Sequence, residues 1–466
     1  MEKQLTFKHK FGYMLGDLAN NLTFGMSAGF LMAFYTDSLG ITAAAVGTLF
    51  LVARMWDAIN DPLMGVLTDK LFKIRQKKHK GKKVDKFRPF LLRGAFPVVI
   101  AGILMFYSPD GLSQVQKLVW AYATYIFWGM SYTFVNIPYG SLQAVMTQDP
   151  AERSSLSVAR GLGGMVGNLL PRLVVPLILA RYAQNEARGF LIAASILGGF
   201  GFISYLVAYF TVEEKVTAQV TSAKKPLKIL DGLKLLSKNR AFIAVSVGSI
   251  AMLIGMMTNQ AMSIYYFREN LQSLRLLSLT GLTSIVPMLI VSIFLSKVVA
   301  KFGVKKTVYT CALVSSIFYG TILVLPDNPY IYIGILLMAS LFMTIPNILV
   351  WGMVSDSIDY NQYLSGQRQE GAIYGSYSFV RKAGQALAGF LSGQGLAIVA
   401  YNPDLAQQTV ETLFGIKFLT VGLPALGMFV AFLSFKFIWH LTPEKKEEIT
   451  QAINKQNEED AEAVNS

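Results

Sequence analysis

Long apolar stretches recur along the whole chain and constrain its fold more than any other feature. Twelve of them are long enough, at about 1.5 Å of rise per helical residue, to cross a bilayer core of about 30 Å. Because a backbone that crosses lipid must satisfy its own hydrogen bonds, we predict that each stretch forms a helix. The predicted spans are residues 12–36, 41–68, 90–108, 117–146, 158–180, 189–212, 240–267, 276–299, 306–325, 330–355, 372–400 and 412–439.

The composition supports a membrane protein and argues against several other classes. Of the 466 residues, 53% are hydrophobic and 15% are charged, which is too apolar for an ordinary soluble enzyme. A single cysteine, Cys311, and three histidines offer no disulfide framework and no Cys- or His-based metal centre. No nucleophile–base pair is visible either. We therefore expect neither an enzyme nor a cofactor, and we interpret the first span as a retained helix rather than a signal peptide.

The basic residues orient the predicted bundle. Lys and Arg concentrate at the N-terminus and in residues 69–93, 212–240 and 296–306, whereas the connections "YTDSLGIT" and "PDNPY" contain none. By the positive-inside rule, the basic segments and both termini are expected to be cytoplasmic, in a multi-pass protein of the cell membrane. The net charge of +14 is then explained by a solvated face near lipid headgroups rather than by nucleic-acid binding. The role of the extended basic loop 70–88 is left open.

A faint internal repeat divides the chain into two sets of six spans. The fourth span contains "IPYGSLQAVMTQD" and the tenth, its counterpart, contains "IPNILVWGMVSDS". Such repeats are typical of transporters. We predict an all-α membrane protein of the major facilitator fold. Its expected parts are an N-terminal half (1–212), a cytoplasmic linker (213–239), a C-terminal half (240–440) and a cytoplasmic tail (441–466).

The second span carries three charges in a helix where each costs on the order of 2.5–3.5 kcal/mol. Asp57 and Asp61 are four residues apart and share one face, with Asn60 beside them. Arg54 can neutralise only one of the two carboxylates. The second favours a proton or a small hard cation such as Na⁺. A helix–helix ion pair is the alternative interpretation.

Other polar residues inside the spans indicate a cavity for a polyol. Amides and hydroxyls can bond sugar hydroxyls, and aromatic rings can cover the apolar side of a sugar ring. Interhelical packing is the alternative for each of them. The predicted substrate-binding residues are Asp17, Asn20, Asn21, Tyr132, Asn136, Arg160, Tyr377, Arg381 and Lys382.

Charged residues at the cytoplasmic ends of the spans are candidates for a gate. They lie beside "DKFRPF", whose counterpart in the second half lies between the eighth and ninth spans, and between the end of the tenth span and the start of the eleventh. We predict that they contribute to closing the cytoplasmic side while the two halves rock. The candidates are Asp69, Arg88, Asp356, Asp359 and Arg368.

Four segments carry a resemblance to a known family. "GTLFLVARMWDAINDPLMG", "VNIPYGSL", "SDSIDY" and "RKAGQALAG" resemble the glycoside–pentoside–hexuronide:cation symporter family, which includes the melibiose carrier. The resemblance implies secondary active uptake of a sugar or glycoside with Na⁺ or H⁺. It also implies a coupling-cation site at Asp57, Asn60, Asp61 and Thr133, and functional basic residues at Arg160 and Lys382. A passive facilitator or a sugar sensor on the same scaffold remains the alternative, and we expect the monomer to be functional.

The chain also departs from the melibiose carriers. It has Asn20–Asn21 where they have a Lys–Asp pair, and Asn136 where they have an acid that grips a galactosyl group. The resemblance is therefore closer to the glucuronide, xyloside and pentoside branch. A cavity that has lost two carboxylates and retains Arg381 and Lys382 would tolerate an anionic uronate, but a neutral xyloside fits the sequence equally well.

Overall fold

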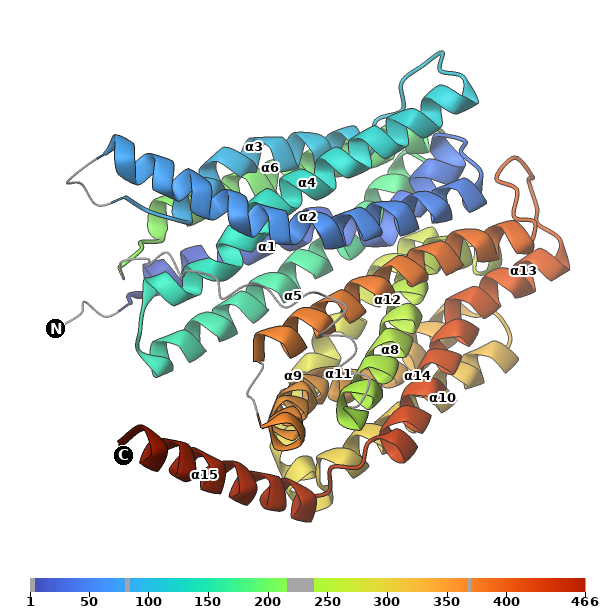
Figure 1. Ribbon diagram of the computed structural model, residues 1–466. Coiled ribbons are helices and arrows are strands. Elements are labelled where there is room, and N and C mark those ends of the chain that lie inside the picture. Colours follow the sequence, from blue (N-terminus) through green and yellow to red (C-terminus); the bar gives the residue numbers. More distant parts are fainter. Residues whose placement is uncertain (1–4, 80–83, 216–238, 367–369, 466) are drawn as a thin grey trace. The chain divides into compact units, whose positions relative to one another are not determined.

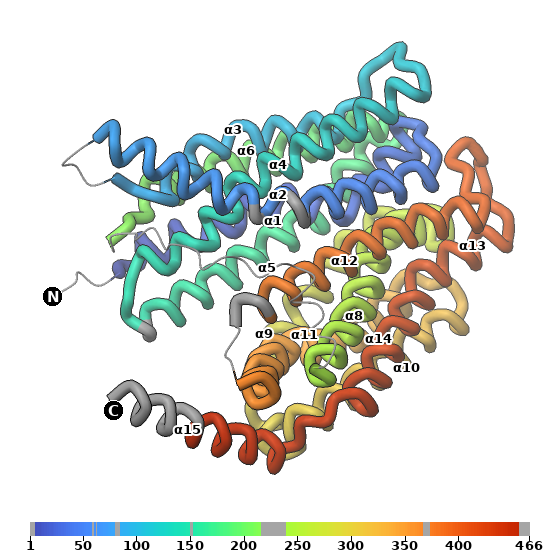
Figure 2. Tube along the Cα trace, in the orientation of Figure 1, coloured from blue at the N-terminus to red at the C-terminus, as the bar shows by residue number. Residues whose placement is uncertain are grey.

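A computed structural model describes residues 5–79, 84–215, 239–366 and 370–465 (Figure 1). Within these ranges the regular secondary structure is entirely helical. Figure 2 follows the chain through the helices in sequence order. Each predicted span coincides with one helical stretch, some of them with a short π- or 3₁₀-helical turn at one end. The prediction of an all-α architecture is confirmed.

The N-terminal helices are long and begin at residues suited to that position. Ser113 accepts a hydrogen bond from the backbone N of Gln116, and Asp149, followed by Pro150, accepts one from the backbone N of Glu152. Their bounds are α1 (Phe7–Ala33) with η1 (Phe34–Ser38), α2 (Ala43–Lys78), α3 (Arg88–Leu104), α4 (Gln114–Met146), α5 (Pro150–Arg181) and α6 (Glu186–Thr211).

The C-terminal helices follow the same pattern, with Asn328 capping the longest of them. Their bounds are α8 (Arg240–Tyr265) with η2 (Tyr266–Asn270), η3 (Leu274–Gly281) with α9 (Leu282–Phe302), α10 (Val304–Val324), α11 (Pro329–Ser365), α12 (Glu370–Ile398), and α13 (Val410–Lys417) with η4 (Phe418–Gly422), α14 (Leu423–Leu433) and η5 (Ser434–Ile438). The last helix is α15 (Pro443–Asn465).

Seven helical stretches of the described chain are long and apolar enough to cross a membrane by length and composition alone. They are α5, α6, α8 with η2, η3 with α9, α10, α11, and α13 through η5. The helices α1, α2, α4 and α12 are not among them. These four carry most of the predicted site residues; α3, which is 17 residues long, is not among the seven either.

The described residues cluster into two compact units. The first unit lies within Met1–Ser222, Gln260–Leu282 and Gly389–Ile416. The second lies within Ala223–Asn259, Thr283–Ala388 and Lys417–Ser466. The first unit therefore contains the six N-terminal helices together with two segments from later in the chain.

Close helix packing in the first unit depends on glycines. A Cβ on Gly163 of α5 would lie 2.1 Å from the carbonyl oxygen of Met14 on α1, and one on Gly167 would lie 2.6 Å from that of Leu18. The end of α12 reaches α2 in the same way, since a Cβ on Gly393 would lie 2.5 Å from the carbonyl oxygen of Ala43. Small residues allow backbones to approach where lipid supplies no hydrophobic drive for association.

The second unit is built on α10, which packs against α11 and α14. A Cβ on Gly427 of α14 would lie 2.4 Å from the carbonyl oxygen of Ala251 on α8. At one end of the unit, α15 packs against α11, and the Lys446 ammonium bonds the Asp356 carboxylate. The C-terminal tail that was predicted from the sequence thus includes a docked helix.

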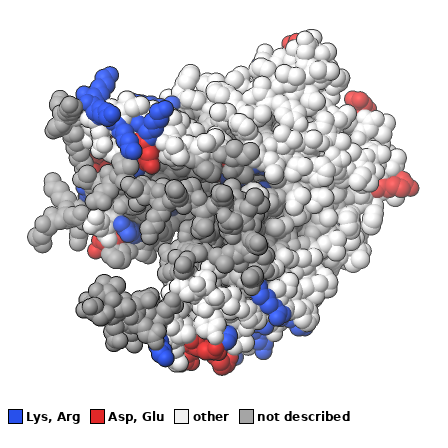
Figure 3. Space-filling view, viewed as in Figure 1, with Lys and Arg blue, Asp and Glu red and all other residues white. Residues whose placement is uncertain are grey.

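The surface of each unit exposes large apolar side chains, among them Phe96 and Phe210 in the first unit and Ile293 in the second. In Figure 3 the visible Lys and Arg of the first unit gather at its left end, where α2 finishes, and its broad face is white. An uncharged band with basic residues at one end is the distribution expected of helices that cross a bilayer.

Candidate functional site

The charges of α2 are held by α1 and α4. The Arg54 Nη1 lies 3.2 Å from the Asp57 Oδ2. The Arg54 guanidinium also lies over the rings of Phe24 and Trp128, 5.2 and 6.0 Å from their centroids. The predicted pairing of Arg54 with one carboxylate is therefore present, and two aromatic rings fix the guanidinium.

The second carboxylate of α2 meets a hydroxyl of α4. Thr133 Oγ1 donates a hydrogen bond of 3.1 Å to Asp61 Oδ1. Asn60 lies between Asp57 and Asp61 in the sequence, and its side chain is buried. Its Nδ2 has no hydrogen-bond partner in the described chain. The structure thus places Asp61 and Thr133 at the contact of α2 with α4, and Asn60 is buried one residue before Asp61 on α2.

A glycine that the sequence reasoning missed completes this contact. Gly129 lies one turn before Thr133 on α4, and a Cβ there would lie 2.9 Å from the Asp57 Oδ1. The absence of a side chain lets the carboxylate pack directly on the α4 backbone. No group of three or more His, Cys, Asp or Glu in the described ranges could hold a metal ion. A cation at this place would therefore need amide and hydroxyl oxygens in addition to the two carboxylates.

A second polar network joins α1 to α5. The Arg160 Nε lies 3.2 Å from the Asp17 Oδ1. Asn21 donates a hydrogen bond of 3.0 Å to the Asp17 Oδ2 and accepts one of 2.8 Å from Asn168. Asp17 is 11% and Arg160 is 40% exposed at the side chain, so the carboxylate is enclosed and the guanidinium remains accessible.

The glycine-rich run of α5 makes room for this network. A Cβ on Gly164 would lie 2.7 Å from the Asp17 Oδ2 and 3.4 Å from the Asn21 Nδ2. Glycine at this position therefore serves the polar contact as well as the close backbone packing described above.

The remaining predicted residues of α1 and α4 have different surroundings. Asn20 is fully buried and accepts a hydrogen bond of 2.7 Å from the Tyr205 hydroxyl of α6. The Tyr132 ring lies 5.5 Å from the Trp128 ring and is half-buried. Asn136 is half-buried and has no hydrogen bond within the described residues. Tyr139, another polar residue of the fourth predicted span, lies under the Arg160 guanidinium, with its ring centroid 5.5 Å from the guanidinium carbon.

In the second unit the predicted residues lie on α12. The Arg381 guanidinium lies over the Trp351 ring of α11, 5.2 Å from its centroid. Tyr377 is buried, and its hydroxyl lies 2.9 Å from the Ser249 hydroxyl of α8. Lys382 is half-buried next to Arg381 in sequence. These residues and those of the first unit form two separate groups, one in each unit.

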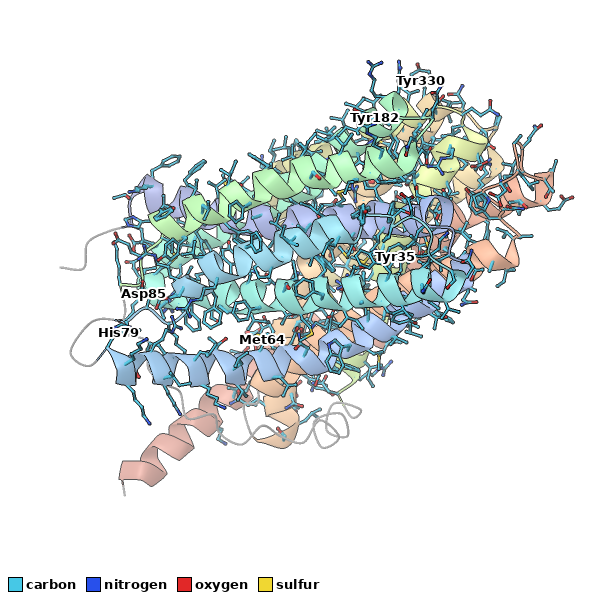
Figure 4. All side chains as sticks on the ribbon, turned by 90° about the horizontal axis from the view of Figure 1, so that it is seen from above. Tyr35, Met64, His79, Asp85, Tyr182 and Tyr330 are labelled. Atoms are coloured by element: carbon cyan, nitrogen blue, oxygen red, sulfur yellow. The ribbon has the colours of Figure 1, made fainter. Side chains whose placement is uncertain are left out.

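The predicted gate residues take part in ion pairs at helix ends. Asp69 lies 2.7 Å from the Lys86 Nζ, and Arg88 lies 3.2 Å from Asp85. Glu214 accepts hydrogen bonds from the backbone N of Lys86, Phe87 and Arg88, which begin α3. Figure 4 shows Asp85 beside the end of α2 at His79, with Tyr35 and Tyr182 toward the opposite end.

Of the three predicted gate residues in the C-terminal part, two lie within the described residues. Asp356 bonds Lys446 of α15, so it is paired with the tail. Asp359 lies one turn later on α11. Arg368 lies outside the described residues.

The sequence reasoning missed one ionic cluster of the first unit. Arg268 of η2 bonds the Asp37 carboxylate of η1, and its Nη2 lies 2.7 Å from the Glu186 Oε2 of α6. Beside it, the Tyr265 hydroxyl lies 2.7 Å from the Thr36 hydroxyl. The Tyr401 ring packs edge-on against Tyr265, and burial together with the nearby Asp37 raises the pKa of Tyr401. We name Asp37, Glu186 and Arg268 the end cluster.

Comparison with known proteins identifies what this chain resembles. Residues 12–441 match the model of a family described as MFS/sugar transport protein. A glucuronide carrier protein homolog of Escherichia coli is 32% identical over 461 residues, 97% of each chain. The putative glycoside/cation symporter YagG of Escherichia coli is 33% identical over 469 residues, 99% of this chain and 98% of that one. The crystal structure of the nucleoside transporter NupG matches with a TM-score of 0.65 at 13% identity, over 93% of this chain and 99% of that one.

Proposed function

We propose, on the premise that this chain belongs to the MFS/sugar transport protein family, that it takes up a glycoside, pentoside or glucuronide together with Na⁺ or H⁺. The membership confirms the resemblance drawn from the four sequence segments. It also confirms the major facilitator fold and the expectation that the chain is a transporter and not an enzyme. The names of the relatives support sugar symport, and the identity of the sugar and of the ion belongs to the proposal.

One observation supports the cation part of the proposal: α4 meets both carboxylates of α2, through the Thr133 hydroxyl at Asp61 and through Gly129 at Asp57. Asn60, which lies between them in the sequence, is buried with its Nδ2 unpartnered within the described chain. Carboxylate, amide and hydroxyl oxygens are the ligands that a hard cation prefers, and a proton can occupy the same place. Arg54 already balances one negative charge at Asp57. A Na⁺ or a proton bound beside Asp57 and Asp61 would add positive charge next to two carboxylates at membrane depth, where negative charge is costly.

The sugar part of the proposal uses side chains of both units. In the first unit Arg160, Asn21 and Asn136 offer hydrogen-bond groups, and Tyr132 offers an aromatic face. In the second unit Arg381 offers donors, and Lys382 follows it on α12. Asp17 holds Arg160 and Asn21 in place, and we assign Asn20 to the contact with Tyr205 rather than to the sugar. The Tyr377 hydroxyl of α12 is hydrogen-bonded to the Ser249 hydroxyl of α8, so we assign Tyr377 to helix packing.

Transport would proceed by alternating access in a monomer. The two halves are 1–212 and 240–440. The linker 213–239, the tail 441–466 and both termini lie, in this proposal, on the cytoplasmic side of the cell membrane. The pairs Asp69–Lys86 and Arg88–Asp85 secure the ends of α2 and α3 on that side. The basic residues near these ends favour contact with anionic lipid headgroups.

Gradient-driven uptake tests the proposal. The full chain, reconstituted in vesicles, should accumulate a glycoside only when a Na⁺ or H⁺ gradient is imposed. The double variant Asp57→Asn, Asp61→Asn should lose accumulation and retain exchange of sugar across the membrane. Asp110→Asn, at an exposed loop position, is the matched control and should behave as the native chain does.

Two results would contradict this assignment. Concentrative uptake by the double variant would show that these carboxylates do not couple the ion. Uptake by the native chain that equilibrates and never exceeds the external concentration, under either gradient, would favour a passive facilitator on the same scaffold.

A further inference from the structure

The second unit contains a pocket beside Arg381, formed by α8, α11 and α12. It has about 280 Å³ of empty space, part of it open to solvent. The enclosed part of this space has room for about one small polar group, so a sugar ring would lie in the part that is open to solvent. The side chains that define its chemistry are Ser249, Met252, Met256, Met343, Asn347 and Arg381.

The charge of Arg381 is not balanced by any carboxylate in the described part of the chain. Its contact there is the face of Trp351. The acids Asp327 and Asp356 of the same unit bond Lys417 and Lys446 instead. An indole face orients a guanidinium but accepts no hydrogen bond in the plane of its N–H groups. The planar fork of Arg381 is thus held beside the pocket with its donors available.

The rest of the pocket is apolar and adaptable. Met252, Met256 and Met343 line it with flexible thioether side chains, which accommodate apolar groups of different shape. Asn347 adds one amide, whose Nδ2 lies 4.0 Å from the Met256 Sδ. The Ser249 hydroxyl is already engaged with Tyr377. The pocket therefore combines one cation, one amide and a methionine surface.

We infer that this pocket is a subsite for the anionic group of the transported sugar, a carboxylate or a sulfonate bonded by Arg381, with the apolar part of a glycoside against the three methionines. The inference rests on the proposed function. A carboxylate or sulfonate matches a guanidinium with two parallel hydrogen bonds, and it would pair a cation that has no carboxylate partner among the described residues. The methionine surface gives tolerance for varied aglycones.

A matched set of ligands tests the inference on the reconstituted full chain. Phenyl β-glucuronide and phenyl β-glucoside differ only in a carboxylate against a hydroxymethyl group. The 6-sulfo analogue of the glucoside distinguishes sulfonate from carboxylate. Arg381→Met should weaken binding of the preferred anionic ligand by about 10- to 100-fold, the size expected for a charge-assisted pair. Binding of the neutral glucoside should fall by less than that of the anionic ligand, because it loses a hydrogen bond to a neutral acceptor rather than a charge-assisted pair.

Two further variants make the result specific. Arg381→Lys keeps the charge and loses the planar fork, so its loss should be intermediate. Arg181→Met removes an exposed arginine at the end of α5 and should leave all three affinities unchanged. Thermal unfolding of each variant in detergent verifies that it is folded.

The outcomes separate this inference from the proposed function. Two results would overturn the inference: equal losses of affinity for the anionic and neutral ligands in Arg381→Met, or no binding of either anionic ligand by the folded native chain. If a gradient still drives uptake of a neutral glycoside, the proposed function stands and only the inference fails. Absence of gradient-driven uptake of every glycoside would overturn the proposed function.

Discussion

Arg268 in the first unit and Arg381 in the second unit hold their charges in opposite ways. Arg268 is shared by two carboxylates, Asp37 and Glu186, which come from two other helices. Arg381 lies on an indole and has no carboxylate in the described part of the chain. Both are half-buried arginines near apolar surroundings.

The difference teaches how to separate a structural arginine from a ligand-binding one. In a buried ion pair each charge stabilises the other within the protein, so removing one member leaves the other desolvated and unbalanced. A guanidinium that stacks on an aromatic ring keeps its N–H donors available for hydrogen bonds to a ligand. Stability should therefore depend on Arg268 and ligand affinity on Arg381.

Removal of Arg268 should produce the largest loss of stability. Arg268→Ala leaves the Asp37 and Glu186 carboxylates without their cation, and deleting one member of a buried pair costs about 3–5 kcal/mol. We expect about 3 kcal/mol, the lower end, because the side chains of Arg268 and Glu186 are 20% and 25% exposed. The free energy of unfolding in detergent, measured by denaturant titration, is the readout.

The same measurement on Arg381→Ala provides the contrast. That variant should cost no more than about 1 kcal/mol, since it loses the contact with Trp351 but leaves no carboxylate of the described residues unpaired. Arg268→Lys should recover part of the loss by restoring the charge. If Arg381→Ala unfolds as easily as Arg268→Ala, then the two arginines do not differ in the way proposed.

The pair Asp17–Arg160 should show intermediate behaviour. Arg160 is 40% exposed and Asp17 only 11%, so the carboxylate depends on its partner more than the guanidinium does. Arg160→Gln alone should destabilise the protein by more than Arg160→Gln combined with Asp17→Asn, with a coupling energy of about 1 kcal/mol. A double-mutant cycle of unfolding free energies measures this coupling. Strictly additive effects would mean that the pair contributes no net stability.

Much of the fold could be predicted from the sequence, for a physical reason. Each span must satisfy its backbone hydrogen bonds within itself, so helix position follows from local apolarity. The spacing of Asp57 and Asp61 is also local, because four residues in a helix always share a face. These predictions needed no knowledge of which helices are neighbours.

The parts that could not be predicted depend on contacts between distant segments. Arg268 lies 231 residues from Asp37 and 82 from Glu186. Charges at the ends of spans are common, and nothing in the sequence assigns them to one another. Asn20 and Asn21 are adjacent, yet one bonds Tyr205 of α6 and the other bonds Asn168 of α5, because α1 packs on both helices.

The smallest expected effect is that of replacing Gly129, and it tests whether the coupling ion binds at Asp57. A methyl group there would lie 2.9 Å from the Asp57 Oδ1, which is too close unless the carboxylate moves. Gly129→Ala should therefore lower the apparent affinity for the coupling ion by several-fold. Better helix propensity, worth about 1 kcal/mol, should compensate in part for the strain and keep the variant folded.

Gly65→Ala is the matched control for Gly129→Ala, because Gly65 lies on α2, one turn beyond Asp61, and has open space around its Cα. It gains the same helix propensity without touching a carboxylate, so the ion dependence of uptake should be unchanged. The concentration of Na⁺ or H⁺ that gives half-maximal uptake is the quantity to compare. Of the two glycines, Gly129 is the one next to Asp57. If both variants change the half-maximal ion concentration equally, the cause is the stiffer helix and not the carboxylate. If neither variant changes it, the coupling ion does not bind at Asp57.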